Sequence, residues 1–239
     1  MEKIIKPQYE YDCYVSLHSH SFYSLLDGLS SVEDIVNKSV NVFNNDKKIR
    51  SKAACISDHG VMFALYELFD LAKKSDQKAI AAFEAYTTGD LYKRKQDEGE
   101  NTREHLLLIA KNKEGYKKLS YLCSVGATDG FYYKPRIDDK LIEKVGGQGI
   151  IATSACLGGK IPHLIAAGKI QEAMEAAKYY KQLFEQFYLE IQPTKEDAQC
   201  KLNQELLKIG EKLDIPLVCT SDSHYTCKDD APIHDMLLA

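Results

Sequence analysis

The stretch Leu17-His18-Ser19-His20, with Asp27 seven residues further on, is the feature around which this chain is organised. The apolar alternation of residues 14–17 predicts a short strand that runs into the histidine pair. Because side chains return to the same face at every second residue of a strand, His18 and His20 are expected to point the same way, about 7 Å apart. Both imidazoles could then reach one metal ion, although such pairs also occur as ordinary surface or core histidines. A metal site therefore requires partners from elsewhere in the chain.

The composition is that of an ordinary soluble chain of 239 residues, 44% hydrophobic and 28% charged. This length suits one large α/β domain or two small ones. A formal net charge of −4 gives no evidence of an extended nucleic-acid surface but does not exclude a local one. No apolar run approaches a membrane span and residues 1–3 do not begin a signal peptide, so we expect a cytoplasmic protein without a membrane partner. The seven scattered cysteines lack a C-x-x-C pair, which argues against a disulfide framework.

Strand and helix patterns alternate along the chain. Short apolar runs predict strands over residues 14–17, 53–57, 79–83, 105–110, 149–153, 187–191 and 217–220. Amphipathic segments predict helices over residues 30–43, 61–74, 113–125, 161–167, 170–184 and 195–213, with Phe63, Phe69, Tyr180 and Phe184 in the core. The charged stretch 88–103 is expected to be a loop. Alternating β and α elements imply a mainly parallel sheet, most simply a barrel of about seven strands with its active site at the carboxyl ends of the strands.

Residues that can bind metals follow the ends of several predicted strands. They are His18 and His20 after the first, Asp58 and His59 after the second, Glu84 after the third, Cys156 after the fifth, and Asp222 and His224 after the seventh. Because the carboxyl ends of parallel strands share one rim, we expect these side chains to meet. Imidazole, carboxylate and a single thiolate suit zinc, manganese or iron. The set is too large for one four-coordinate ion, so it predicts two or three metals bridged by a carboxylate such as Glu84 or Asp222, an arrangement that favours phosphate-ester hydrolysis.

Three further histidines do not follow this rule. His105 begins its predicted strand rather than ending it, so the pattern alone indicates a capping or core residue. His163 and His234 lie on helical patterns away from strand ends and are interpreted as ordinary polar or core residues.

Seven local motifs identify a known family. They are His18-Ser19-His20-Ser21 with Ser24-Leu25-Leu26-Asp27-Gly28, Ser57-Asp58-His59-Gly60, Phe83-Glu84-Ala85-Tyr86, residues 105–112, residues 130–138, residues 154–159 and Ser221-Asp222-Ser223-His224-Tyr225. Through them, the chain from about Tyr14 to Leu238 resembles the PHP (polymerase and histidinol phosphatase) domain of bacterial DNA polymerase III alpha subunits. The run 130–138 distinguishes the polymerase branch from free-standing phosphatases.

The resemblance implies an α/β fold, a distorted seven-stranded (β/α)7 TIM-like barrel, holding up to three divalent metals (zinc, manganese or iron). Its ligand positions match His18, His20, Asp27, His59, Glu84, His105, Cys156, Asp222 and His224, of which Asp27, Glu84 and Asp222 are the expected catalytic carboxylates. His105 thus becomes a ligand, which a local strand reversal would explain. Asp58 is not a usual ligand position and is expected to orient a ligand imidazole. All nine positions carry residues able to bind a metal, which favours a functional site.

The activity implied by the resemblance is metal-dependent 3′–5′ exonucleolytic proofreading of DNA. Lys134 and Arg136 are candidate phosphate contacts and Tyr133 or Tyr132 a stacking surface for an unpaired base, although these side chains could also simply pack the loop. Two alternatives are a metal-stabilised structural module that supports the polymerase or a separate proofreading subunit, and a small-molecule phosphatase, against which the run 130–138 argues. Residues 1–239 are expected to be a single PHP domain from the N-terminal part of a longer polymerase chain, with the rest of that chain and replisome subunits as partners and no polymerase activity of its own.

Overall fold

The computed structural model describes residues 14–40, 42–44, 47–49, 51–93 and 103–239. The N-terminal residues and most of the predicted loop over 88–103 therefore lie outside the described part. The strands are β1 (Val42–Asn44), β2 (Lys47–Ile49), β3 (Ala53–Ile56), β4 (Lys78–Thr88), β5 (Glu104–Ala110), β6 (Arg136–Asp138), β7 (Gly147–Thr153), β8 (Phe184–Ile191) and β9 (Leu217–Cys219). The helices are α1 (Val32–Val40), α2 (Leu65–Lys74), α3 (Lys113–Thr128), α4 (Asp139–Val145), α5 (Lys160–Ala166), α6 (Ile170–Leu183), α7 (Asp197–Leu213) and α8 (Ala231–Leu238), with a 3₁₀ turn at Lys228–Asp230.

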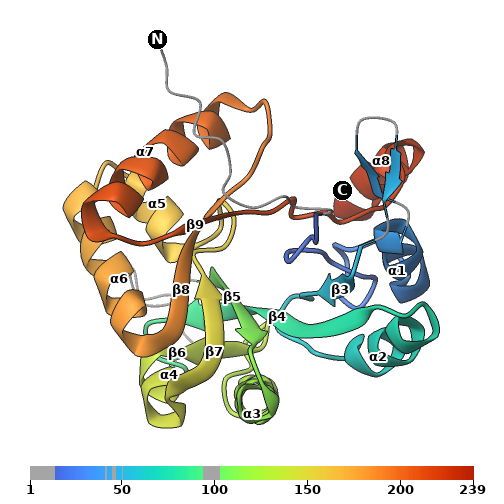
Figure 1. The fold of residues 1–239 in the computed structure, drawn as a ribbon. Coiled ribbons are helices and arrows are strands. Elements are labelled where there is room, and N and C mark those ends of the chain that lie inside the picture. Colours follow the sequence, from blue (N-terminus) through green and yellow to red (C-terminus); the bar gives the residue numbers. More distant parts are fainter. Residues whose placement is uncertain (1–13, 41, 45–46, 50, 94–102) are drawn as a thin grey trace.

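A curled sheet of seven strands occupies the centre, and the helices pack around its outside (Figure 1). The strand order is β3-β4-β5-β7-β8-β9, and β6 pairs with the end of β4. The pairs β3–β4, β4–β6, β7–β8 and β8–β9 are parallel, whereas β5 runs antiparallel to both β4 and β7. The predicted α/β barrel-like fold is thereby confirmed, with a mixed rather than wholly parallel sheet.

The reversal of β5 explains the position of His105. In the antiparallel pairing His105 lies opposite Tyr86, near the carboxyl end of β4. The start of a reversed strand lies at the same rim as the ends of its neighbours. The strand reversal expected from the family resemblance is confirmed.

The predicted strand over residues 14–17 is wrong. Ser19 makes a single parallel bridge to Ser223, and its carbonyl accepts a hydrogen bond of 2.8 Å from the backbone N–H of Ser57. These partners come just after β9 and β3, so the histidine segment joins the two edges of the curled sheet only at the rim. No longer ladder forms because β3 and β9 have already ended. The residues on either side of Ser19 still share one face, as the alternation predicted.

Apolar side chains bury both faces of the central strands. Outward-facing residues of β5 and β7, including Leu106, Leu108 and Ala152, pack against the helices. Inward-facing Leu107 and Ile109 join Cys55 and Ala82 inside the curl. Because both faces are buried, the sequences of these strands are continuous apolar runs and do not alternate between apolar and polar residues.

The expectation that helix faces bury four aromatic residues is only half right. Tyr180 and Phe184 are buried, but Phe63 and Phe69 are 66% and 46% exposed. Helix α2 begins only at Leu65, so Phe63 precedes it. The inner face of α2 is formed by Leu65, Leu68 and Ala72, which leaves Phe69 turned away from the core.

Two smaller expectations concern cysteines and membranes. The cysteines of the described residues are free, as the lack of a paired spacing predicted. Among the described helices, none combines the length and the apolar character that crossing a bilayer demands.

Candidate metal centre

His18 and His20 point together into the curled sheet, and both side chains are completely buried. Their ring centroids are 5.1 Å apart. The Nε2 atom of His18 lies 3.3 Å from Oε1 of Glu84 and 3.2 Å from Oδ1 of Asp222. The Nε2 atom of His20 lies 3.3 Å from Oε2 of Glu84 and 3.3 Å from Oδ1 of Asp222. The predicted convergence of the two imidazoles is therefore present in the structure.

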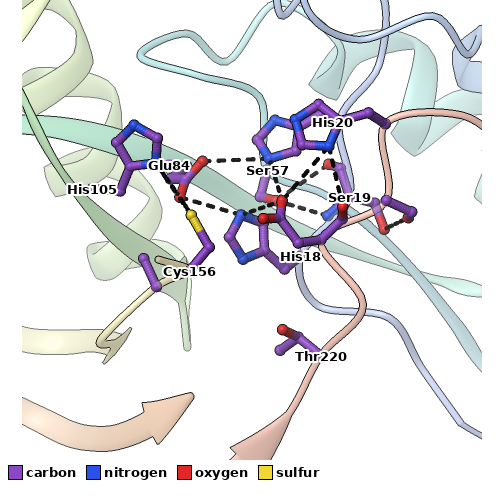
Figure 2. Close-up of polar contacts among 12 residues, drawn as sticks. His18, Ser19, His20, Ser57, Glu84, His105, Cys156 and Thr220 are labelled. Atoms are coloured by element: carbon purple, nitrogen blue, oxygen red, sulfur yellow. Dashed lines mark hydrogen bonds and ion pairs between the residues drawn. The ribbon is translucent and has the colours of Figure 1, made fainter. Parts of the chain in front are cut away.

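Glu84 lies at the centre of the cluster, between His105 on one side and the histidine pair on the other (Figure 2). Strand β4 continues beyond the end of β3, and this extension carries the Glu84 carboxylate to the rim. Its Oε1 is 3.0 Å from Nδ1 of His105, and its Oε2 is 2.9 Å from Nδ1 of His59. A carboxylate with both oxygens facing different imidazoles is suited to bridging two cations.

Asp27, His59 and His224 form one side of the cluster. Oδ2 of Asp27 lies 2.9 Å from Nε2 of His59 and 3.5 Å from Nε2 of His224. Asp27 is held in a turn in which its N–H donates to the carbonyl of Ser24, and its own carbonyl accepts a hydrogen bond of 2.9 Å from His234 in α8. Because Asp27 lies in a turn and does not follow a strand, the rule based on strand ends did not select it.

Cys156 completes the opposite side beside His105. Its Sγ atom is 3.4 Å from Nδ1 of His105 and 3.7 Å from Oε1 of Glu84. The loop after β7 turns at Ala155, whose φ is +57°, and the carbonyl of Gly158 accepts the backbone N–H of His105 at 2.9 Å. The structure thus brings together all nine residues that the resemblance selected.

The buried ligand-type atoms lie within ion-pair distance of one another but lack hydrogen-bond geometry. Five of them in the described residues have no hydrogen-bond partner: His18 Nε2, His20 Nε2, His59 Nδ1, Glu84 Oε2 and Asp222 Oδ1. Leaving a buried polar atom unsatisfied costs about 1–3 kcal/mol, so such atoms require a partner. Three overlapping triads have donor atoms within 4.8 Å of one another: His20, His59 and His224; His18, His20 and Glu84; His59, Glu84 and His105. Imidazole and carboxylate donors at these separations fit divalent metal ions.

The charges of the cluster also favour a cation. Burial alone would lower the pKa of His18, but the carboxylates of Glu84, Glu190 and Asp222 outweigh it and raise that pKa. In the same way the pKa of His59 rises to about 9 against its burial, because Asp27 and Glu84 face it. Burial would raise the pKa of Glu84, but the facing imidazoles hold it well below its usual range. The site therefore attracts positive charge, as protons when no metal is bound and as metal ions otherwise.

Asp58 supports the cluster from behind. Its carboxylate accepts hydrogen bonds from the backbone N–H of Ser21 at 2.7 Å and from the hydroxyl of Ser24 at 2.9 Å. The Ser24 oxygen lies 3.0 Å from Nδ1 of His20. Asp58 can thus orient His20 through Ser24 rather than by direct contact.

Glu190, in β8, also contacts the cluster but was not selected from the sequence. Its Oε1 lies 2.6 Å from Nδ1 of His18, and the residue is 1% exposed. The available signal was a glutamate inside the apolar run 187–191, where a buried charge needs a partner.

The predicted substrate contacts have different outcomes. Lys134 is partly buried, with Nζ 5.8 Å from the centre of the Tyr86 ring, which itself stacks on His59. Tyr133 is 75% exposed in a left-handed conformation with φ +59°. These two residues remain candidates for contact with a substrate.

The expectation that Arg136 binds a phosphate is wrong. Its side chain is fully buried, Nε donates to the carbonyl of Gly130, and Nη2 donates to the carbonyls of Leu91 and Lys93. Its guanidinium also lies 5.2 Å from the centre of the Tyr132 ring. Arg136 therefore joins two loops from inside.

Comparison with known proteins places these features in context. The sequence model of the PHP domain matches residues 16–194. The chain is 38% identical over 227 residues to the DNA polymerase III subunit alpha of Borreliella burgdorferi, covering 94% of this chain and 19% of that protein. It is 37% identical over 233 residues to the same subunit of Aquifex aeolicus, covering 95% of this chain and 19% of that protein. The chain thus spans about a fifth of the length of these relatives.

Two solved structures share the fold. One is a Bifidobacterium adolescentis protein provisionally named a metal-dependent phosphoesterase, with a TM-score of 0.52, 13% identity, and coverage of 89% of this chain and 88% of that one. The other is an amidohydrolase from Chromobacterium violaceum, with a TM-score of 0.50, 11% identity, and coverage of 93% of this chain and 96% of that one. At these identities the similarity concerns the fold alone.

Proposed function

Because this chain belongs to the PHP domain family, we propose that its metal centre is a phosphoesterase site that removes nucleotides from the 3′ end of DNA. The observation that supports the proposal most directly is the group of buried nitrogen and oxygen atoms that face one another without hydrogen bonds. Such an arrangement suits ligand atoms directed at a common cation. The relatives, which are DNA polymerase III alpha subunits, point to DNA as the substrate.

The nine clustered residues would hold two or three divalent ions. Glu84, with both oxygens engaged, and Asp222, which faces both His18 and His20, are suited to bridge neighbouring ions. Divalent ions in such a cluster lower the pKa of water and offset the negative charge of a phosphate ester. Asp27 contributes the third carboxylate of the proposed catalytic set.

A substrate would approach the cluster where its residues reach the surface, at Asp27, His105 and His224. Their side chains are 28%, 20% and 18% exposed, whereas those of His18, His20 and Glu84 are completely buried. Lys134, next to Tyr86 on this rim, could contact a phosphate, and the exposed ring of Tyr133 could stack on an unpaired base. The buried histidines would hold the ions while the more open side receives the DNA end.

The test is hydrolysis of 3′-mismatched DNA by the full-length protein, after elemental analysis of its bound metals. We expect hydrolysis to cease with a chelator, to return with Mn²⁺ or Zn²⁺, and to be absent in the Glu84→Ala, Asp222→Ala double variant. Glu185→Ala is the matched control, because this glutamate lies on β8 but pairs with Lys111, outside the cluster. Hydrolysis that persists in the double variant would overturn the proposal.

One observation favours a second candidate, a structural role for the metals. The histidine segment joins the regions after β3 and β9, and ions bound to His18 and His20 would fasten this junction. Metal binding to the folded state stabilises it whether or not catalysis occurs. A metal-dependent rise in melting temperature without hydrolysis of mismatched DNA or of phosphomonoesters would favour this role.

We further propose that residues 1–239 form one PHP domain of a longer DNA polymerase III alpha chain. The small share of each relative that the chain covers supports this. The partners would then be the DNA 3′ end, the rest of that chain and replisome subunits, all in the cytoplasm.

A further inference from the structure

Glu190 lies directly behind His18, on the side of the ring away from the other cluster residues. Its Oε1 is 2.6 Å from Nδ1 of His18, and both side chains are completely buried. The opposite nitrogen of the ring, Nε2, lies within 3.3 Å of Glu84 and Asp222. The two ring nitrogens of His18 therefore serve different purposes, one facing the cluster and one facing Glu190.

Other groups hold the Glu190 carboxylate in this orientation. The hydroxyl of Thr220 donates to Oε1 at 2.5 Å, and the hydroxyl of Thr153 donates to Oε2. Nε2 of Gln192 lies 3.4 Å from Oε1, and the backbone N–H of Glu190 donates to the hydroxyl of Ser154. Since these donors occupy both oxygens, Glu190 stays behind His18 and does not turn towards the cluster.

In two neighbouring histidines, His20 and His224, the group nearest to Nδ1 is neutral instead. Nδ1 of His20 lies 3.0 Å from the hydroxyl of Ser24, and Nδ1 of His224 lies 3.1 Å from the backbone carbonyl of Asp222. A carboxylate behind an imidazole fixes the tautomer and increases the basicity of the opposite nitrogen more than a neutral acceptor does. His18 is thus set apart from these neighbours by its partner.

We propose that Glu190 is a positioning residue, which accepts the Nδ1–H of His18 and so keeps the Nε2 lone pair directed at the metal cluster. The inference rests on the proposed metal site but not on the hydrolysis of DNA. Glu190 itself contacts neither metal nor substrate. It acts through His18, and Thr153 and Thr220 hold it in place.

The first test compares metal affinity in full-length protein by competition with a chromophoric chelator, using Zn²⁺ and Mn²⁺ separately. Glu190→Gln keeps the shape but removes the charge, and we expect a dissociation constant about 10- to 100-fold weaker than that of the wild type. Glu185→Gln, on the same strand but paired with Lys111, should change nothing. Thr220→Val leaves the carboxylate in place, should weaken binding by a smaller factor, and serves as a second variant if Glu190→Gln does not fold.

The second readout is the NMR signal of the His18 ring in ¹⁵N-histidine-labelled, Zn²⁺-loaded protein. We expect a strongly hydrogen-bonded Nδ1–H proton at low field in the wild type and a shift to higher field in Glu190→Gln. A general loss of stability would not produce this local change. Unchanged metal affinity in Glu190→Gln, or an unchanged His18 signal, would overturn the inference.

The outcomes also separate this inference from the proposed function. A wild-type protein that binds metal but does not hydrolyse DNA contradicts the exonuclease proposal and leaves the affinity comparison to decide the role of Glu190. A wild-type protein that hydrolyses DNA, with a Glu190→Gln variant of equal metal affinity, contradicts only the positioning role. A wild-type protein that binds neither ion contradicts both.

Discussion

In the absence of metal, the stability of the protein should fall as pH rises from 6.5 to about 9. The principal reason is His59, whose pKa rises from 6.5 to about 9 because Asp27 and Glu84 outweigh its burial. A group whose pKa is raised by folding stabilises the folded state below its unfolded pKa and loses that contribution as pH rises through its folded pKa. The pKa values of His18 and His224 are also raised, so they act in the same direction.

The size of this loss of unfolding free energy follows from the pKa of His59. At about 1.36 kcal/mol per pH unit, the interval from 6.5 to about 9 corresponds to about 3 kcal/mol of unfolding free energy for this histidine. The carboxylates act in the opposite direction at low pH. The pKa values of Glu84, Asp222 and Asp27 are lowered, so their stabilisation is present above the unfolded pKa near 4 and is lost as pH falls. Metal-free protein should therefore be most stable between about pH 4.5 and 6.5.

Urea denaturation in EDTA at several pH values measures this effect. His59→Gln removes the titrating group, so the stability difference between wild type and variant should shrink by about 3 kcal/mol from pH 6.5 to 9. His163→Gln is the control, because its side chain is 53% exposed and its pKa is lowered by burial and by His105. The reasoning would be refuted if the unfolding free energies of wild type and His59→Gln changed in parallel with pH. It would also be refuted if the unfolding free energy of the wild type increased from pH 6.5 to 9.

Three other predictions concern the rim and the cluster. In urea denaturation, Arg136→Ala should lower the unfolding free energy by at least about 3 kcal/mol, because buried carbonyls lose their donor. Lys134→Ala should change the unfolding free energy by less than about 0.5 kcal/mol but should slow DNA hydrolysis. Zn²⁺ or Mn²⁺ at 100 times its dissociation constant should stabilise the folded state by about 2.7 kcal/mol in thermal denaturation, and EDTA should abolish the gain. Gly158→Ala would place a Cβ 2.8 Å from Nδ1 of His105. Titration with Zn²⁺ should therefore show weaker binding, while the melting temperature of the metal-free protein should change little.

The sequence was most informative where local pattern and burial coincide. Strands β5 and β7 are buried on both faces, so their apolar runs identified them directly. The histidine pair was placed on one face by alternation alone, and that placement holds although its segment forms only one bridge. Side chains that alternate between two faces require an extended backbone, but they do not require a complete set of hydrogen bonds to a neighbouring strand.

Strand direction could not be predicted from the local sequence. Whether a strand runs parallel or antiparallel depends on its neighbours and on the connection between them. The residues alone therefore indicated a capping or core role for His105, and only the family resemblance corrected this. The pairing of His105 with Tyr86 supplies the physical explanation.

The chain by itself determined which metal-binding side chains are available and that most of them follow strand ends, because both facts depend on residue type and local periodicity. Only the tertiary structure decided which charged groups face inward. The side chain of Arg136, expected to contact phosphate, donates to the carbonyls of Leu91 and Gly130. Glu190, in an apolar run, contacts His18 from 172 residues away. A buried charge is stable only where hydrogen-bonding partners surround it, and those partners are distant in sequence. Folding thus turned His18 and His20 from a local pair into part of a cluster with Glu84 and Asp222.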